Sequence, residues 1–167
     1  MVHSRSVRSI LMLLITVLTL FVINVPWSAA DDSWEFPPGL ICPEFGVRWD
    51  THLDVDLYRE VAPRRGGVVH GIFFQAGQVT FTNLSTGKQV SEYLDGALFH
   101  DRYYPDGTAL STLSGEFVVS LYPTDTPAGP SLRLYNGRMT YRTDVDGNWT
   151  VESFRGTSVD LCARLAN

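Results

Sequence analysis

The chain has few of the residues on which common enzyme and cofactor sites depend. Two cysteines, four histidines and a single lysine, Lys88, occur among its 167 residues. A glycine-rich phosphate loop, a Gly-x-Ser-x-Gly nucleophile elbow and a Cys-x-x-Cys pair are all missing from the sequence. The sequence therefore offers no recognisable catalytic residue or metal site, and we expect no cofactor.

The N-terminus carries the pattern of a secretory signal. A basic start is followed by an apolar run over residues 10–25 and by the small residues Ser28-Ala29-Ala30. The run covers roughly 16 residues, fewer than the ~20 that a membrane-spanning helix needs. We predict a signal peptide over residues 1–30, a secreted product, and no membrane span after cleavage.

Acidic residues outnumber basic ones. The sequence has 18 Asp and Glu against 13 Lys and Arg, and removal of Arg5 and Arg8 with the signal leaves 11 basic residues. The mature chain then carries a formal charge of about −7 at neutral pH. Because nucleic-acid binding needs clustered Lys and Arg, we expect no nucleic-acid partner.

The two cysteines lie near the two ends of the mature chain. In an oxidising compartment an even count favours a disulfide, here Cys42 to Cys162. Such a bridge closes a loop of about 120 residues, to which the chain-entropy model assigns roughly 4 to 5 kcal/mol. Two free thiols and half of a metal site are the alternatives, but neither cysteine has a second ligand at zinc-site spacing.

The rest of the chain alternates apolar and polar residues between turn motifs. Residues 31–43, rich in proline, predict an extended N-terminal arm, and residues 44–167 a single β domain. The expected fold is an antiparallel β-sandwich or partly closed barrel of about seven to nine strands with a short C-terminal helix capped by Ser158. A bulge is expected near Asp50-Thr51. Three turn motifs predict hairpins: Ser85-Thr86-Gly87-Lys88, Pro105-Asp106-Gly107 and Asp146-Gly147-Asn148.

A weak internal echo relates two of these hairpins. Glycine, threonine-aromatic and glutamate positions in residues 77–96 recur sixty positions later in residues 137–156. Equal spacing suggests two similar hairpins in related positions, although glycine in turns and threonine beside aromatics are common in any β protein.

Several groups of residues could carry chemistry. Trp149, Tyr103 and Tyr104 lie beside turns, and we expect them to contribute to an aromatic binding surface. His100-Asp101 resembles part of a hydrolase dyad, but no nucleophile is placed beside His70 or His100, and both histidines are more typical of ordinary sheet residues. Paired carboxylates across a concave sheet would suit a glycosidase, and candidates are Asp54, Asp56, Glu92, Asp95, Glu116 and Glu152.

Two polar motifs have a turn as their simplest explanation. Residues 144–148, Asp-x-Asp-Gly-Asn, offer calcium ligands at alternate positions, but the glycine is misplaced for an EF-hand and no glutamate follows at its twelfth position. Asn83-Leu84-Ser85 and Asn148-Trp149-Thr150 match the N-glycosylation pattern, and we expect both to lie in turns that could tolerate a glycan.

The order of these motifs resembles a family of small exported proteins that is common in actinobacteria and has no assigned activity. The motifs that carry the resemblance are Pro38-Gly39-x-x-Cys42, Thr80-Phe81-Thr82-Asn83-Leu84-x-Thr86-Gly87-Lys88, Pro105-Asp106-Gly107, Gly137-Arg138, Asp144-x-Asp146-Gly147-Asn148 and Asp160-Leu161-Cys162-Ala163-x-Leu165. The resemblance implies an exported β domain with paired terminal cysteines and supplies no catalytic residues.

The sequence thus favours a secreted, non-enzymatic domain that binds an extracellular protein or a glycan. A secreted hydrolase with paired carboxylates is the first alternative. A secreted inhibitor that presents the loop Thr124 to Pro130 is the second.

Overall fold

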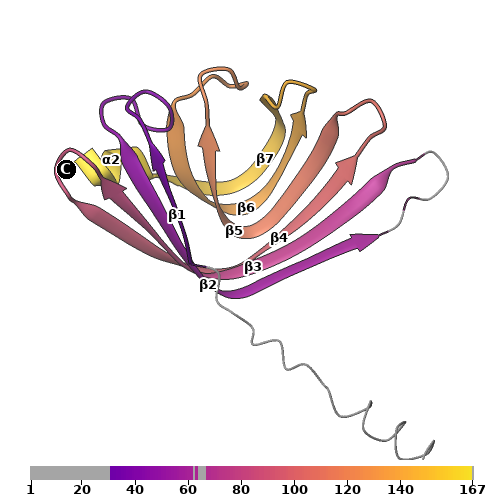
Figure 1. Cartoon of the computed structure of the whole chain (residues 1–167), viewed down its shortest axis with the longest axis horizontal. Helices are drawn as coiled ribbons and strands as arrows, with labels where there is room; N and C mark the ends of the chain where they lie inside the picture. Colours follow the sequence, from indigo (N-terminus) through magenta and orange to yellow (C-terminus); the bar gives the residue numbers. More distant parts are fainter. Residues whose placement is uncertain (1–30, 62, 64–66, 167) are drawn as a thin grey trace, which may run out of the picture.

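The chain forms one antiparallel sheet of seven strands in chain order, followed by a short helix (Figure 1). The computed structural model describes residues 31–61, 63 and 67–166, so the predicted signal peptide lies outside the described residues. The elements are β1 (Asp31–Phe36), β2 (Val47–Val61), β3 (Val69–Asn83), β4 (Gln89–Tyr103), β5 (Ala109–Leu121), β6 (Ser131–Thr143), β7 (Trp149–Asp160) and α2 (Leu161–Ala166). The predicted antiparallel β fold with a C-terminal helix is confirmed, and the sheet stays open because β1 and β7 do not pair.

Each strand follows the alternation seen in the sequence, and each tight hairpin follows its turn residues. In the β4–β5 turn, Asp106 Oδ1 accepts hydrogen bonds from the backbone N–H and the hydroxyl of Thr108 at 3.0 and 2.8 Å.

Residues 31–36 of the expected N-terminal arm pair with β2 as an edge strand. The bulge in β2 lies between Leu53 and Val55, and the prediction of a bulge near Asp50-Thr51 is wrong, because pairing with β1 and β3 is continuous there.

A row of glycines bends the sheet into a trough. Strands β3 to β7 each carry one mid-strand glycine with positive φ: Gly77, Gly96, Gly115, Gly137 and Gly156. Gly137 and Gly156 face each other across β6 and β7, and a Cβ on Gly137 would lie 2.1 Å from the carbonyl oxygen of Arg155. Only glycine allows two backbones to approach this closely at a φ near +149°.

The same row explains the internal echo. The two related segments form the hairpins β3–β4 and β6–β7, and each hairpin places one of its glycines in each strand at the bend. The sixty-residue spacing therefore reflects the same bend made twice in one sheet.

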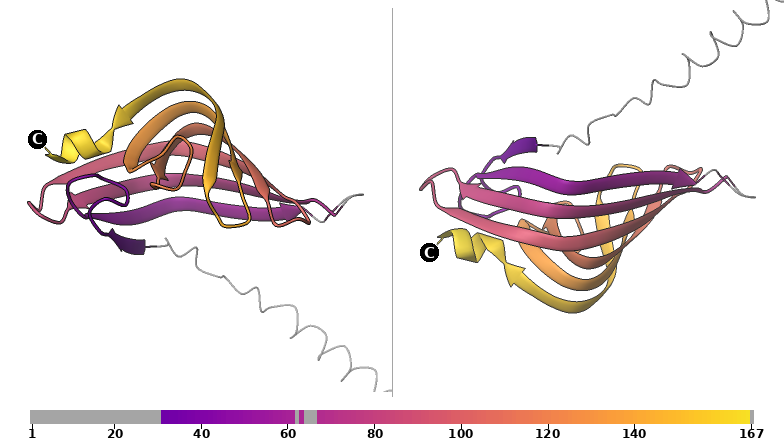
Figure 2. Two further views of the ribbon diagram at one scale, coloured as in Figure 1. Left: turned by 90° about the horizontal axis from the view of Figure 1, so that it is seen from above. Right: turned by 90° about the horizontal axis from the view of Figure 1, so that it is seen from below.

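The sheet divides at Gly115. Strand β5 pairs with β4 only from Ala97↔Gly115 to Tyr103↔Ala109, and beyond Gly115 it pairs with β6 alone. A Cβ on Gly115 would lie 2.2 Å from the carbonyl oxygen of Gly96, so the two strands touch closely just before they separate. Figures 1 and 2 show the resulting trough, in which the ends of β5, β6 and β7 rise away from β2, β3 and β4.

Two apolar clusters stabilise this shape. The first joins β2, β3, β4 and β6 to the β1–β2 loop and α2, and its fully buried members include Ile41, Val47, Phe81, Leu132, Leu161 and Leu165. The second fills the bend of β5, β6 and β7 with Leu113, Phe117, Val119, Tyr135, Met139 and Tyr141.

The predicted disulfide is present. Cys42 in the β1–β2 loop and Cys162 in α2 are bonded with their Cα atoms 5.6 Å apart, and both are buried in the first cluster. The bridge therefore ties the first hairpin to the last element of the fold.

The helix cap differs from the expectation. Asp160 Oδ1 accepts a hydrogen bond from the backbone N–H of Ala163 at 2.9 Å, so Asp160 is the N-cap. Ser158 still belongs to β7, where its hydroxyl accepts from Arg133 Nε, and its prediction as the cap is wrong because the strand runs two residues further. Among the described residues, no helix is long and apolar enough to cross a membrane.

Candidate functional site

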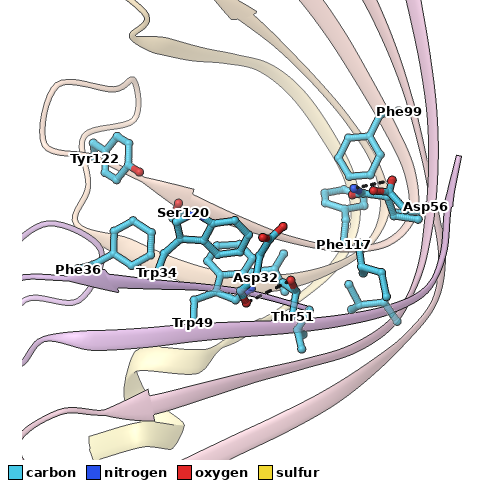
Figure 3. A pocket seen from close by; sticks show the side chains of 16 residues that line it. Asp32, Trp34, Phe36, Trp49, Thr51, Asp56, Phe99, Phe117, Ser120 and Tyr122 are labelled. Atoms are coloured by element: carbon cyan, nitrogen blue, oxygen red, sulfur yellow. Dashed lines mark hydrogen bonds between the residues drawn. The ribbon is translucent and has the colours of Figure 1, made fainter. Parts of the chain in front are cut away.

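An open groove of about 550 Å³ runs along the inner side of the sheet, where β5 separates from β4 (Figure 3). One wall comes from β1 to β4 and the other from the end of β5. Its lining residues are Asp32, Trp34, Phe36, Trp49, Thr51, Leu53, Asp56, Gln75, Val79, Leu94, Ala97, Phe99, Phe117, Val118, Ser120 and Tyr122. Most of the lining residues are apolar or aromatic, and the polar ones are Asp32, Thr51, Asp56, Gln75 and Ser120.

Two tryptophans form one wall of the groove. Trp34 on β1 and Trp49 on β2 are register partners, with their rings edge to face at 6.4 Å. Trp49 packs against buried Phe81 at 5.1 Å, which fixes its ring, whereas Trp34 keeps 47% of its surface exposed. Trp49 Nε1 is buried and has no hydrogen-bond partner in the described part of the chain. Trp34 is therefore the aromatic face of this wall that a ligand can reach.

The opposite wall is held by a buried carboxylate. Asp125 is 5% exposed and accepts hydrogen bonds from two backbone N–H groups, that of Tyr122 at 2.6 Å and that of Trp149 at 2.7 Å. These bonds tie the β5–β6 loop to the start of β7 and fix the chain at Tyr122, whose ring lines the groove. The loop that could serve an inhibitor is thus anchored at its base, with Thr124, Thr126, Pro127 and Ala128 exposed.

Acceptors line the groove beside these aromatic rings. Asp56 Oδ1 accepts a hydrogen bond from Gln75 Nε2 at 3.2 Å, which orients the amide and the carboxylate toward each other. Asp32 lies on β1 opposite Thr51, at the Trp34 end. Beyond Gly115, no described strand pairs with the edge of β5 that faces β4, so its backbone groups add further donors and acceptors.

The aromatic surface continues along the inner side of β2, β3 and β4. Tyr58 packs on Phe73 at 4.5 Å, and Phe99 is the register partner of Phe73. Gly71 makes room for this surface, because a Cβ there would lie 3.2 Å from the rings of both Phe73 and Tyr103. The inner side therefore offers aromatic rings well past the end of the groove.

The three aromatic residues expected to form a binding surface lie elsewhere. Tyr103 is on the inner side with 41% of its surface exposed, and its hydroxyl donates to Asp101 Oδ2 at 3.1 Å. Burial, with the charge of Asp101, raises the pKa of Tyr103 to about 12. Trp149 stacks on Tyr141 at 4.2 Å against the second cluster, and Tyr104 begins the β4–β5 turn. None of the three lines the groove.

The carboxylates considered for a hydrolase do not converge. Of the six, only Asp56 lines the groove. Glu92 pairs with Arg164, Glu152 pairs with Arg142 at 3.0 Å, and Asp54 accepts from the Tyr93 hydroxyl at 2.9 Å. Asp32, which the sequence analysis did not select, is the second carboxylate of the groove.

His100 and Asp101 face opposite sides of the sheet. Asp101 lies on the inner side beside Tyr103, whereas the His100 ring contacts His70 on the outer side, with Nδ1 of His70 and Nε2 of His100 3.0 Å apart. Neighbouring residues of a strand point to opposite faces, so this pair cannot act as a dyad.

Residues 144–148 form a hairpin turn. Asp144 Oδ1 accepts hydrogen bonds from the backbone N–H groups of Asp146 and Asn148, both at 2.9 Å, and these bonds and the Asn148 amide lower the pKa of Asp144. Its oxygens therefore organise the turn itself. Within residues 31–61, 63 and 67–166, no three His, Cys, Asp or Glu side chains are grouped as a metal site.

One glycosylation expectation is wrong. Asn83 is 2% exposed, and its amide donates to the carbonyl of Leu165 at 3.2 Å while its Oδ1 accepts from the backbone of Ser85. The side chain is a structural link between the β3–β4 turn and α2, so the folded protein cannot carry a glycan there.

No family model, curated protein or solved structure matches the chain.

Proposed function

We propose that the protein is a secreted, non-enzymatic binding protein that holds an extended glycan in the groove between β1–β4 and β5. One observation carries the proposal: aromatic rings from β1, β2 and the end of β5 line a single open groove together with carboxylate, amide and hydroxyl groups. Sites of this kind combine an apolar surface with a few placed polar groups.

The chemistry of the groove suits a neutral or cationic sugar chain. The flat C–H faces of a sugar ring pack on an exposed aromatic ring such as Trp34 or Tyr122. Its hydroxyls donate to the carboxylates of Asp32 and Asp56, and the amide of Gln75 donates in return. Two carboxylates in one groove disfavour a polyanionic ligand. The structural disulfide agrees with an oxidising, extracellular location.

Titration of the purified protein with soluble neutral polysaccharides and chitooligosaccharides tests this proposal. Calorimetry should show saturable binding, and Trp34→Ala should weaken it by about tenfold or more because a stacking face is lost. Tyr93→Ala is the matched control, since Tyr93 is 57% exposed but does not line the groove. Equal binding by both variants, or no binding to any glycan, would contradict the proposal.

The groove also supports the hydrolase alternative through Asp32 and Asp56. Release of new reducing ends during the same titrations, abolished by Asp32→Asn or Asp56→Asn with binding retained, would replace the binding protein by a glycosidase. Binding without release of reducing ends supports the proposal as stated.

A further inference from the structure

The outer side of β2 to β7 differs in composition from the inner side. Asp56, Gln75 and Ala97 line the groove, so the residues next to them, Leu57, Phe74 and Leu98, face outward. These three are direct register partners across β2, β3 and β4. Between the bend and the β4–β5 turn, no described strand or helix packs on this side, which Figure 2 shows from below, whereas beyond the bend Leu132 and Leu134 of β6 are buried in the first cluster.

Between the glycine bend and the β4–β5 turn, outward positions on this side carry five arginines in a chain whose net charge is −5. They are Arg59, Arg102, Arg138, Arg142 and Arg155. Within the described residues, the only ion pair that any of them forms is the one between Arg142 and Glu152. At the same end of the sheet, the inner positions of these strands hold Asp56, Glu60 and Asp101 and no basic residue. At this end of the trough the two faces are therefore oppositely charged, whereas beyond the bend the outer side holds Arg48 together with Asp50 and Glu116.

Two of the arginines lie directly opposite each other, so their positive charges repel. Arg138 and Arg155 are register partners on β6 and β7, and both are exposed. Like charges directly opposite each other on a sheet destabilise it. A bound anion would remove this repulsion.

Apolar side chains lie beside the arginines. Leu57 and Leu98 are each 45% exposed, and Ile72 and Phe74 are each 37% exposed. The Phe74 ring covers Gly96, where a Cβ would lie 2.9 Å from its Cζ, so the ring is held flat against the outer side. We call these four residues with the five arginines the outer patch.

We propose that the outer patch docks the protein on the surface of an anionic phospholipid bilayer. Charge complementarity selects an anionic partner, since Glu152 is the only acidic residue among the described outward strand positions between the bend and the β4–β5 turn. The apolar residues select a lipid surface over a soluble polyanion, which would leave them in water. A second copy of this chain would bring the same arginines together and is disfavoured. The proposal does not depend on the ligand of the groove.

Co-sedimentation with vesicles tests the proposal. The purified protein is mixed with vesicles of phosphatidylcholine alone and of phosphatidylcholine with 30% phosphatidylglycerol, at about 50 and 500 mM NaCl. Binding to the anionic vesicles at low salt, with little binding to the neutral ones, is the expected result. Equal binding to both compositions, or binding to neither, would overturn the proposal.

Arginine-to-glutamine variants test whether the outer patch is the surface that binds the vesicles. Arg138→Gln with Arg155→Gln should weaken vesicle binding by roughly tenfold or more, since each arginine near an anionic surface contributes to affinity. The control with the same charge change is Arg48→Gln with Arg164→Gln, two exposed arginines outside the patch that each lose one surface ion pair. Equal weakening by the two pairs would mean that only net charge matters and would reject the patch.

Apolar variants separate a lipid surface from other anionic partners. Leu57→Ser with Leu98→Ser keeps the charge and should weaken vesicle binding severalfold, whereas Leu84→Ser with Val159→Ser, which are 41% and 43% exposed outside the patch, should not. Circular dichroism confirms that each variant is folded. If the first pair binds vesicles normally, or if the protein prefers heparin or DNA to vesicles, a soluble polyanion is the partner and the proposal is wrong.

Discussion

At the scale of single residues, the side chains that define the site are fixed by contacts far away in the sequence. Asp125 illustrates this best, because its carboxylate satisfies backbone groups on both the end of β5 and the start of β7. A short loop with two prolines and a glycine gives no sign in the sequence that its aspartate is buried.

Asp125→Ala should destabilise the protein by about 3 kcal/mol, because it leaves two partly buried backbone N–H groups without their acceptor. Urea unfolding measures the change. Asp146→Ala, in an exposed turn and without a side-chain acceptor bond of its own, serves as control and should stay within about 0.5 kcal/mol of the wild type. Similar values for both variants would mean that the Asp125 bonds contribute little.

The lowered pKa of His100 should make the stability of the protein depend on pH. Burial lowers its pKa, as do the neighbouring charges of His70 and Arg102, whereas Asp101 raises it slightly. A histidine whose folded pKa is depressed favours folding in its neutral form, so its contribution is complete above about pH 6.5 and decreases as the pH falls below that value.

The difference in unfolding free energy between the wild type and His100→Gln should therefore shrink from pH 7.5 to pH 5. Gln keeps a hydrogen-bonding group opposite His70 but does not titrate in this range. Carboxylates elsewhere act equally on both proteins, so the difference isolates His100. A difference that is constant with pH would show that His100 does not titrate abnormally.

At the scale of elements, the bend of the strands depends on glycine. The sequence shows glycines in strand-like segments, which are as typical of a bulge or of a turn as of a bend. Their alignment across five strands follows from the register, and a hairpin register depends on loop lengths that single residues do not reveal.

Gly137→Ala should cost about 3 kcal/mol or more, because its Cβ would collide with the carbonyl of Arg155 at a φ that L residues rarely adopt. Gly147→Ala is the matched control: its φ is +87° but no atom lies within 4 Å of its Cβ, so only backbone strain of about 1 kcal/mol is expected. Thermal unfolding compares the two. Equal losses of stability in the two variants would mean that the close approach of β6 and β7 adds nothing to the cost of a Cβ.

At the scale of the whole molecule, the disulfide connects the two ends of an open sheet. The bond joins residues 120 positions apart and links the β1–β2 loop, next to the Trp34 wall of the groove, to α2. Its loss removes a restraint on the unfolded chain and loosens the wall that β1 provides.

The double variant Cys42→Ser with Cys162→Ser should lose roughly 4 kcal/mol of stability. Guanidinium unfolding measures the loss, and the wild type under reducing conditions should behave like the variant. An unchanged midpoint in both experiments would falsify the stabilising effect of the bridge.

The local and compositional features of this protein follow from its sequence alone. Period-two alternation, turn residues such as Pro105-Asp106-Gly107, and two cysteines in a chain with a secretory pattern led to an antiparallel β fold with a closing helix and a disulfide. Each of these depends on residues near in sequence or on a simple count. The same alternation also places His100 and Asp101 on opposite faces of β4.

The positions of the groove and of the outer patch depend on the tertiary structure. The groove exists because β5 leaves β4 at Gly115, which brings Tyr122 into the same groove as Trp34, and nothing within either segment encodes that meeting. The charge difference between the two faces likewise needs the register of six strands. Strand periodicity is a local property of the backbone, whereas register and separation of strands depend on packing between residues that are distant in the chain.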